Sequence, residues 1–276
     1  MNVAAALDEA IQRLSDFPTP PLDAEILLAH TLGVDRVRVL ADPDRPLSES
    51  DQEHFRSLIN QRATGRPVAY LVGHKEFYGR RFQVNSAVLV PRPDSELLVE
   101  LALARVIPGD SVVDVGTGSG CLGLSIASVR PDLDVHLVDL SAVALSLAAE
   151  NAAALRVPKV RLHRGDLWPE LGLRPERTVV VANLPYVPDQ HLNDDRTLRH
   201  EPRMALAGGA DGLDTIRRFL GELARRRFHP RTLLLEHDPN QASAIDGLAN
   251  GPVQTHADLA GRTRVTEISP ASVLSA

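Results

Sequence analysis

Several residue types are scarce in this 276-residue chain, and their scarcity excludes several classes of protein. A single cysteine, Cys121, cannot form an internal disulfide, which is typical of a protein kept in a reducing compartment. No apolar run approaches the roughly 18 residues that a membrane-spanning helix requires. The first ten residues, MNVAAALDEA, lack the basic start of a secretory signal. The sequence therefore predicts a cytoplasmic protein with no membrane partner.

Positive charge is also scarce. The chain holds 30 Lys and Arg residues against 36 Asp and Glu, which gives a formal net charge of −6. Residues 1–90 alone hold ten basic and twelve acidic residues, with no dense basic cluster. Proteins that bind nucleic acid stably neutralise its phosphates with clustered Lys and Arg. We therefore expect no stable nucleic-acid partner.

The patterns that are present divide the chain into three stretches. Residues 1–73 repeat apolar side chains at helical spacing and show no strand-like alternation. Residues 74–90 include EFYGRRFQV, in which Gly79 separates aromatic residues as in a β-hairpin. Residues 91–276 alternate between helical and strand patterns. We therefore predict a small all-helical N-terminal domain, a hairpin linker and a larger α/β domain.

The third stretch contains short apolar strands separated by helical segments. Repeated βα units of this kind form a mostly parallel sheet with helices on both faces, so the predicted fold class is α/β. Two further strands are expected near the C-terminus. The predicted strands are residues 111–115, 134–139, 159–166, 178–183, 232–238, 253–256 and 264–268.

A glycine-rich loop, DVGTGSGCLG, joins the first of these strands to the next helix. Glycine lets the backbone turn tightly and approach a ligand, and the helix N-terminus behind it attracts negative groups. The loop could also be a structural turn alone. It matches a dinucleotide fingerprint too, because Gly118-x-Gly120-x-x-Gly123 is followed by Asp139 about 20 residues later. For either ligand, Asp139 would end the second strand and hold ribose hydroxyls.

An acidic residue inside the first strand favours a different cofactor. The spacing Asp114-x-Gly116-x-Gly118-x-Gly120 resembles the first motif of Rossmann-like, S-adenosylmethionine-dependent methyltransferases. In that resemblance Asp114 helps to hold the amino-acid end of the cofactor. A dinucleotide enzyme would need a hydride partner and a nicotinamide pocket, for which the sequence shows no clear candidate. The methyltransferase alternative predicts a second motif after the fourth strand, which lies next to the first at the ligand-binding edge of such sheets.

The fourth strand does run into a second motif, VVVANLPYVP at residues 179–188. Asn183 could simply end the strand, since asparagine tolerates turns. Its expected position beside the glycine loop instead favours a functional role. The stretch resembles the Asn-Pro-Pro-Tyr motif of methyltransferases that act on planar nitrogen, either glutamine amides or adenine amines. Leu184 stands where the first proline is usual, a form more familiar among adenine-N6 enzymes acting on RNA.

The chemistry of an amide nucleophile accounts for these residues. Its lone pair is delocalised, so methylation depends on positioning and on acceptors for its two N–H groups. Asn183 and the backbone carbonyl of Leu184 or Pro185 can accept them, while Tyr186 can stack on the planar group. No general base is required before transfer, because the proton becomes acidic afterwards. We therefore predict Asn183, Pro185 and Tyr186 as catalytic residues and Asn183 to Tyr186 as the substrate-binding segment.

Six segments extend the resemblance over essentially the whole chain. They are FYGRRFQVNSAVLVPRPDSELLVE, GTGSGCLGLSIA, NLPYVP, HEPRMALAGGADGLDTIR, LLLEH and ADLAGRTRV. On these segments the chain is identified as a member of the release factor glutamine methyltransferase family. The resemblance implies a class I methyltransferase domain preceded by a helical substrate-recognition domain. The implied reaction is N5-methylation of the glutamine in the Gly-Gly-Gln motif of class 1 peptide chain release factors. The implied S-adenosylmethionine contacts are Gly116, Thr117, Gly118, Ser119, Gly120, Asp139, Asp166, Leu167 and Asn183.

Several alternatives stay open on the sequence alone. The target could be an adenine of RNA or DNA, or a glutamine of a ribosomal protein. Arg92 is expected to pair with Glu96 on its own helix, whereas Glu201 and Pro202 could shape the substrate pocket or only brace a loop. We expect a monomer whose site holds no metal ion.

Overall fold

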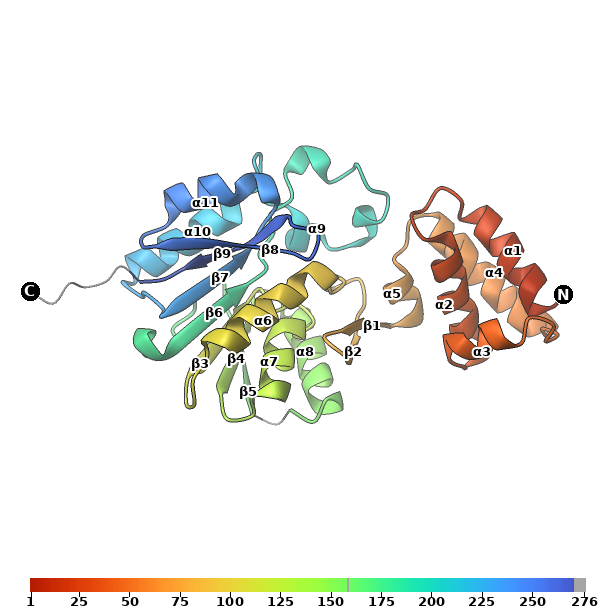
Figure 1. Ribbon diagram of the computed structural model, residues 1–276, viewed down its shortest axis with the longest axis horizontal. Helices are drawn as coiled ribbons and strands as arrows, with labels where there is room; N and C mark the ends of the chain where they lie inside the picture. The colour runs from red at the N-terminus through yellow and green to blue at the C-terminus, as the bar shows by residue number, and fades with distance from the viewer. Residues whose placement is uncertain (158, 271–276) are drawn as a thin grey trace, which may run out of the picture. The chain divides into compact units, whose positions relative to one another are not determined.

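The structure is a computed structural model that describes all residues except Pro158 and 271–276, the latter being the end of the predicted third stretch. The chain forms two compact units (Figure 1). One unit consists of residues 1–74 together with 195–200, and the other contains the rest of the chain. Each unit has its own hydrophobic core.

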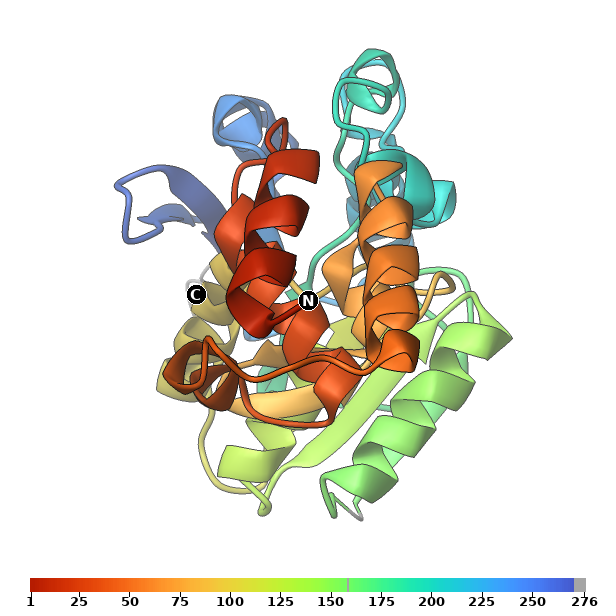
Figure 2. The same ribbon diagram turned by 90° about the vertical axis from the view of Figure 1, so that its right-hand side faces the viewer.

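The first unit is a set of short helices, seen as the red to orange ribbons in Figure 2. Local residues set the helix ends. The side chains of Asn2 and Ser48 each accept a backbone N–H of the first helical turn that follows them. Gly33 ends the second helix in a left-handed conformation. The helices are α1 Val3–Arg13, α2 Pro20–Leu32, α3 Arg36–Ala41, α4 Glu49–Ala63 and α5 Val68–Val72.

A buried ion pair links two helices of this unit. Arg62 Nε donates to Asp23 Oδ2 at 2.7 Å, and each side chain is only 8% exposed. Residues 195–200, distant in sequence, pack on the same unit. A Cβ on Gly65 would stand 2.7 Å from the carbonyl oxygen of Arg196, so only glycine fits at that contact.

The second unit is built on a seven-stranded sheet of order β5-β4-β3-β6-β7-β9-β8. The first five strands in this order are parallel, whereas β9 runs antiparallel to both β7 and β8. The separate hairpin of β1 His74–Phe77 and β2 Arg80–Gln83 turns at Tyr78 and Gly79, both at positive φ. The sheet strands are β3 Ser111–Val115, β4 Asp134–Asp139, β5 Val160–Arg164, β6 Thr178–Ala182, β7 Thr232–Glu236, β8 Val253–Ala257 and β9 Thr263–Ile268.

Helices cover both faces of this sheet (Figure 1). Successive strand residues point to opposite faces, so Val112 and Val113 of β3 belong to two different cores. The helices on the Val112 face are α6 Glu96–Arg105, α7 Cys121–Val129 and α8 Ala142–Ala154. Those on the Val113 face are α10 Asp214–Arg225 and α11 Ala242–Leu248. The short 3₁₀ turn η1 Pro93–Ser95 precedes α6, and the short helix α9 Arg203–Leu206 follows the loop after β6.

The predicted fold class is confirmed: a helical N-terminal part, a hairpin and a Rossmann-like sheet. The fourth strand of the predicted series, β6, lies beside β3 as expected. Helix α3 and the 3₁₀ turns η3 Asp189–His191 and η4 Leu198–His200 were not predicted, because such short elements carry too little periodicity. None of the described helices has the length and apolarity needed to cross a bilayer.

Candidate active site

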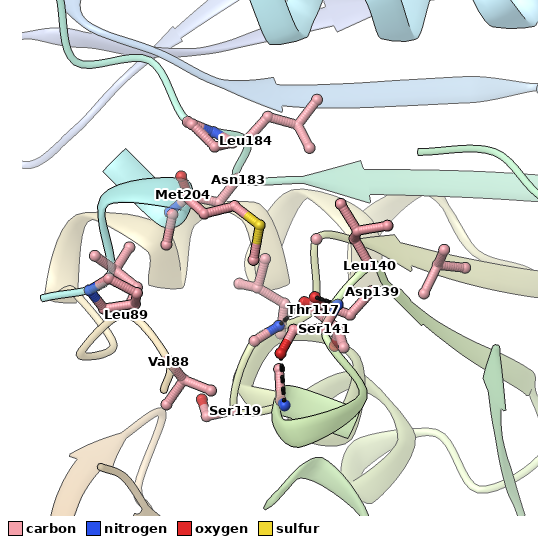
Figure 3. A pocket seen from close by; sticks show the side chains of 18 of the residues that line it. Val88, Leu89, Thr117, Ser119, Asp139, Leu140, Ser141, Asn183, Leu184 and Met204 are labelled. Carbon is pink, nitrogen blue, oxygen red and sulfur yellow. Dashed lines mark hydrogen bonds between the residues drawn. The ribbon is translucent and has the colours of Figure 1, made fainter. Parts of the chain in front are cut away.

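A cleft with a cavity volume of about 190 Å³ opens at the carboxyl ends of β3, β4, β5 and β6. In an open α/β sheet, the loops on either side of the central strand diverge there and leave a crevice. Figure 3 shows Ser119, Asp139 and Asn183 reaching this cleft from three of these loops. The predicted residues that line it are Gly116, Thr117, Gly118, Ser119, Asp139, Asp166, Leu167, Asn183, Leu184 and Pro185. Asp114, Gly120 and Tyr186 are not among its lining residues.

Backbone geometry explains the glycines of the loop after β3. Gly116, Gly118 and Gly120 have φ angles of 72°, 54° and 82°, in the left-handed region that favours glycine. A Cβ on Gly116 would lie 3.3 Å from Cδ2 of Leu184, so the two motifs found in the sequence pack against each other. Glycine is needed at position 123 for a different reason, because a Cβ there would collide with a side chain of β4. The last glycine of the dinucleotide-type pattern therefore serves the packing of α7 on the sheet.

Asp114 holds the glycine loop through two hydrogen bonds. Its Oδ2 accepts the Thr117 hydroxyl at 2.6 Å and the Gly123 N–H at 2.9 Å. Burial raises the pKa of the Asp114 carboxyl to about 6, and Oδ1 has no partner among the described residues. Because Asp114 does not line the cleft, its contact with the cofactor stays a prediction.

Asp139 joins two loops at the cleft. Its Oδ2 accepts the N–H of Gly118 at 2.9 Å, and its Oδ1 accepts the N–H of Ser141 at 2.8 Å. These two bonds hold the carboxylate in one orientation, and each oxygen keeps a further lone pair. Sugar hydroxyls are donors that a fixed carboxylate of this kind can accept. The geometry is therefore compatible with the ribose contact predicted for Asp139.

Three further lining residues also suit a ligand that carries a ribose and a planar base. The hydroxyl of Ser119 is buried beside the cleft and has no partner among the described residues. An unpartnered buried hydroxyl is costly, so it suits a polar group of a bound molecule. Leu140 and Leu167 add apolar wall for a planar base. A fixed carboxylate, an orphan hydroxyl and apolar walls at a glycine loop together fit S-adenosylmethionine.

Asp166 lies at the rim of the cleft and has a cationic partner. Its Oδ2 accepts Nη2 of Arg218 from α10 at 2.5 Å, and both side chains are more than half exposed. Leu167 follows at a φ of 59°, an uncommon conformation for leucine. Both residues line the cleft, and their contacts with adenine stay predictions.

Asn183 directly follows β6 and is half-buried at the cleft. Its Nδ2 donates to the hydroxyl oxygen of Ser95 at 2.9 Å. This bond fixes which way the side-chain amide faces, and it leaves Oδ1 without a protein donor among the described residues. Leu184 is buried, and both Leu184 and Pro185 line the cleft. The structure thus holds a carbonyl-type acceptor at the end of β6, next to the glycine loop.

Tyr186 does not line the cleft, and two hydrogen bonds anchor it. Its hydroxyl donates to Oε1 of Glu236 at 3.2 Å, and its backbone carbonyl accepts Nε2 of Gln241 at 2.9 Å. Burial, followed by the nearby Glu236 carboxylate, raises the pKa of the Tyr186 phenol well above its ordinary value. Its predicted stacking on the substrate stays a prediction.

Two residues of this site, Ser95 and Glu236, were given no role by the sequence. Ser95 lies in VPRPDSE at the end of η1, and Glu236 ends β7, the strand next to β6. The signal that could have found Glu236 is a carboxylate ending an otherwise apolar strand, TLLLE, because parallel strands end at the same edge of a sheet. Ser95 carried no comparable signal.

The expected pairing of Arg92 with Glu96 is wrong. Arg92 instead forms an ion pair with Glu201, whose other oxygen accepts the Val90 N–H at 3.0 Å. Glu96 accepts the backbone N–H of Tyr78 at 2.7 Å. Arg92 has extended backbone ahead of η1, so it does not share a helical face with Glu96.

The ion pair of Arg92 also bears on the two roles considered for Glu201 and Pro202. The Glu201 side chain is fully buried and bonded to the segment before η1, so it braces this part of the loop. Arg92 and Pro202 line the cleft. In the described part of the chain, no group of three His, Cys, Asp or Glu side chains could hold a metal ion.

The sheet order, the glycine loop after its central strand and the amide at the end of the neighbouring strand define a class I, S-adenosylmethionine-dependent methyltransferase. Comparison with known proteins narrows this class. A profile described as "PrmC N-terminal domain" matches residues 5–73, and one described as "Methyltransferase small domain" matches residues 92–200. The chain belongs to the release factor glutamine methyltransferase family.

Relatives of that name match nearly the full length. The release factor glutamine methyltransferase of Moorella thermoacetica is 40% identical over 96% of this chain and 97% of its own length. The one of Xylella fastidiosa strain Temecula1 is 41% identical over 95% of this chain and 94% of its own length.

Among solved structures, the fold recurs at low sequence identity. The hMettl16 catalytic domain, solved with an RNA hairpin, is 10% identical with a TM-score of 0.57. That match covers 83% of this chain and 84% of the other. A methyltransferase from Pyrococcus furiosus is 15% identical with a TM-score of 0.50, over 77% of this chain and 98% of the other. These two structures share the fold.

Proposed function

We propose that this protein transfers a methyl group from S-adenosylmethionine to the side-chain amide nitrogen (N5) of the glutamine in the Gly-Gly-Gln motif of class 1 peptide chain release factors. The observation that carries the proposal is the orientation of Asn183, whose Nδ2 is bound to Ser95 at 2.9 Å so that Oδ1 is left for a donor in the cleft. Membership of the family supports the choice of a glutamine amide as that donor.

The proposed chemistry is one of positioning. The cofactor supplies an electrophilic methyl group on a sulfonium. The Oδ1 of Asn183 and the backbone carbonyl of Leu184 or Pro185 accept the two N–H groups of the substrate amide, which aims its nitrogen at the glycine loop. Fixing two reactants in this way can contribute ~7–11 kcal/mol, and each preplaced acceptor adds on the order of 3 kcal/mol as positive charge grows on nitrogen.

The cofactor contacts are assigned by the same logic. Asp139 would hold the ribose hydroxyls, because Gly118 and Ser141 already fix its carboxylate. Ser119 would donate to a polar group of the cofactor, and Asp166 with Leu167 would meet its adenine. Gly116, Thr117 and Gly120 would shape the loop that receives it. Pro185 would fix the turn so that the backbone carbonyl of Leu184 or Pro185 points into the site, and Tyr186 would stack on the planar substrate group.

We assign the recognition of the release factor to residues 1–73 and catalysis to residues 91–276, with residues 74–90 as the linker. Two compact units, each with a buried hydrophobic interior of its own and its own profile match, support this division. We further propose a cytoplasmic monomer with no stable nucleic-acid partner. The net charge of −6 and the lack of a basic cluster in residues 1–90 support that part of the proposal.

The substrate is tested with methyl-labelled cofactor and four separate targets: a class 1 release factor, its variant with the Gly-Gly-Gln glutamine changed to alanine, a ribosomal protein mixture and rRNA. We expect label on the intact release factor alone. Label on rRNA would favour adenine methylation, to which the Asn-Leu-Pro-Tyr form of the motif points. Label on a ribosomal protein, with none on the release factor, would mean that the enzyme methylates a glutamine of a different protein.

A further inference from the structure

One buried asparagine joins the glycine loop to the hairpin linker. Asn151 of α8 is 1% exposed. Its Nδ2 donates to the carbonyl oxygen of Ser119 at 2.9 Å and to that of Gln83 at 3.1 Å, while its Oδ1 accepts the Gln83 N–H at 2.7 Å. Two carbonyls and one N–H fit a side-chain amide in a single orientation, so these bonds hold together or fail together. Asn151 is therefore a fixed anchor for two segments that are distant in the chain.

The bond to Ser119 holds one peptide plane of the glycine loop from both sides. Asn151 holds the carbonyl of that peptide, and its N–H, which belongs to Gly120, donates to the Thr117 carbonyl at 2.8 Å. Rotation of this peptide would break both hydrogen bonds, and a buried carbonyl without a donor is costly. The same peptide sets the direction of the Ser119 side chain, whose hydroxyl has no partner among the described residues.

The bonds to Gln83 hold the linker at the last residue of β2. Further along the linker, residues 87–89 line the cleft. Val88, in the middle of them, is 1% exposed, and a Cβ on Gly118 would stand 3.9 Å from its Cβ. Figure 3 shows Val88 and Ser119 at the same cleft, one from the linker and one from the glycine loop. The linker thus packs against the loop in addition to connecting two domains.

We propose that Asn151 is a positioning residue for the cofactor site, because it holds the glycine loop and the linker to one helix and thereby makes residues 87–89 a wall of that site. This inference rests on the proposed function in one respect, namely that the glycine loop receives S-adenosylmethionine.

The inference separates two roles that Asn151 could have. If it positions the loop, its loss lets the Ser119 peptide turn and moves the Ser119 hydroxyl away from the place where it donates to the cofactor. Cofactor binding then weakens although no group that touches the cofactor has been removed. If Asn151 only supports α8, its loss lowers the stability of the domain and leaves the affinity of the folded protein unchanged.

The first measurement needs no ligand. Hydrogen exchange of the Gly120 N–H is followed by NMR in wild type, in Asn151→Ala and in the control Thr178→Val. Thr178 is also a buried polar side chain bonded to a backbone carbonyl, that of Arg174 at 2.8 Å, and it does not line the cleft. We expect exchange to become at least about tenfold faster in Asn151→Ala only.

Two outcomes of the exchange measurement overturn the positioning role. One is an exchange rate in Asn151→Ala equal to that of wild type. The other is an equal acceleration in Thr178→Val, which would attribute the effect to lost stability alone. Asn151→Ser, whose side chain is also too short to reach both segments, takes the place of Asn151→Ala if that variant does not fold.

The second measurement is the cofactor Kd by calorimetry. We expect Asn151→Ala to raise it by about tenfold to a hundredfold and Thr178→Val by less than about twofold. A double-mutant cycle with Ser119→Ala tests the route through Ser119. The double variant should bind hardly more weakly than Asn151→Ala, because the hydroxyl is already misplaced there. Effects of the two single changes that multiply as independent ones overturn this route.

The third measurement tests the wall with two identical substitutions in the linker. Val88 and Val84 are both buried, at 1% and 3% exposure, but only Val88 lines the cleft. We expect the cofactor Kd to rise about fivefold in Val88→Ala, because apolar contact is lost, and to change little in Val84→Ala. Equal Kd values in the two variants overturn the assignment of residues 87–89 to the site.

Failure of the proposed function has a different signature. A wild-type protein that binds S-adenosylmethionine and leaves release factors unlabelled refutes the proposed substrate, while the Kd values still decide the role of Asn151. A wild-type protein that does not bind this cofactor refutes the proposed site, and the exchange rate at Gly120 still decides whether Asn151 holds the loop. Normal binding by wild type with an unchanged Kd in Asn151→Ala refutes only the inference.

Discussion

Gly116 and Leu184 are in contact between two motifs that lie 68 positions apart in the chain: a Cβ on Gly116 would stand 3.3 Å from Cδ2 of Leu184. The same Cβ would lie 3.9 Å from the carbonyl oxygen of Asn183. Leu184 is 3% exposed and belongs to the core on the α10 face of the sheet. The glycine loop after β3 and the Asn-Leu-Pro-Tyr motif after β6 are therefore packed against each other, and a substitution at this contact is expected to affect both.

The first prediction concerns Gly116→Ala. The new methyl group would be strained at a φ of 72° and would press on Leu184, so the loop must shift. We expect the cofactor Kd, measured by calorimetry, to rise at least about tenfold. Gly172→Ala is the control, because Gly172 has a φ of 66° and a Cβ added there would meet nothing within 4 Å. An equal rise in Kd for both variants would show that backbone strain alone, and not the contact with Leu184, is responsible.

The second prediction concerns Asn183→Ala. Removing the acceptor should lower kcat by at least about a hundredfold, because its stabilisation is needed only as charge grows on the substrate nitrogen. The cofactor Kd should change little, since Asp139 and the glycine loop keep their geometry. Single-turnover methylation and calorimetry measure the two effects separately. Asn250→Ala, an asparagine away from the cleft lining, serves as the control. Near-normal turnover in Asn183→Ala would show that Asn183 is not the acceptor needed for methyl transfer.

The third prediction concerns stability and pH. The pKa of Glu236 is about 7 in the folded chain against 4.5 ordinarily, so the folded state holds its proton more tightly than the unfolded state does. The stability that this group contributes is present below pH 4.5 and is lost as pH rises through 7.

Glu236→Gln removes that titration. The free energy of unfolding of the variant, relative to wild type, should therefore increase from pH 4.5 to pH 8 by about 3 kcal/mol, at roughly 1.4 kcal/mol per pKa unit. Denaturant titrations at four pH values measure this difference. A difference that stays constant between pH 4.5 and pH 8 would mean that folding does not raise the pKa of Glu236.

The fourth prediction concerns the helical unit. Asp23→Ala leaves Arg62 buried without its carboxylate, which should destabilise this unit by about 3–5 kcal/mol. Denaturant unfolding followed by circular dichroism measures the loss. Glu25→Ala is the control: Glu25 pairs with the half-exposed Arg36 at 2.9 Å, so its removal should cost at most about 1 kcal/mol. Similar losses in the two variants would mean that the buried pair contributes no more than the exposed one.

Local patterns predicted the elements that carry strong periodicity or apolar runs. The strand predicted at residues 111–115 coincides with β3, and the one at 134–139 with β4, because each is a short apolar run between turn residues. Helix α3, RVRVLA, alternates polar and apolar residues over only six positions, so its sequence does not indicate a helix. The pairing of Arg92 was predicted from spacing along a helix, and it failed because Arg92 lies outside that helix.

The sequence by itself determined which chemical groups stand at the ends of which strands, because strand and turn formation depend on neighbours in the chain. It placed Asp139, Asn183 and the glycine loop at one edge of the sheet through the rules of parallel topology. Only the tertiary structure decided their hydrogen-bond partners. Ser95 meets Asn183 across 88 positions and Arg92 meets Glu201 across 109, and such partners depend on which segments the fold brings side by side.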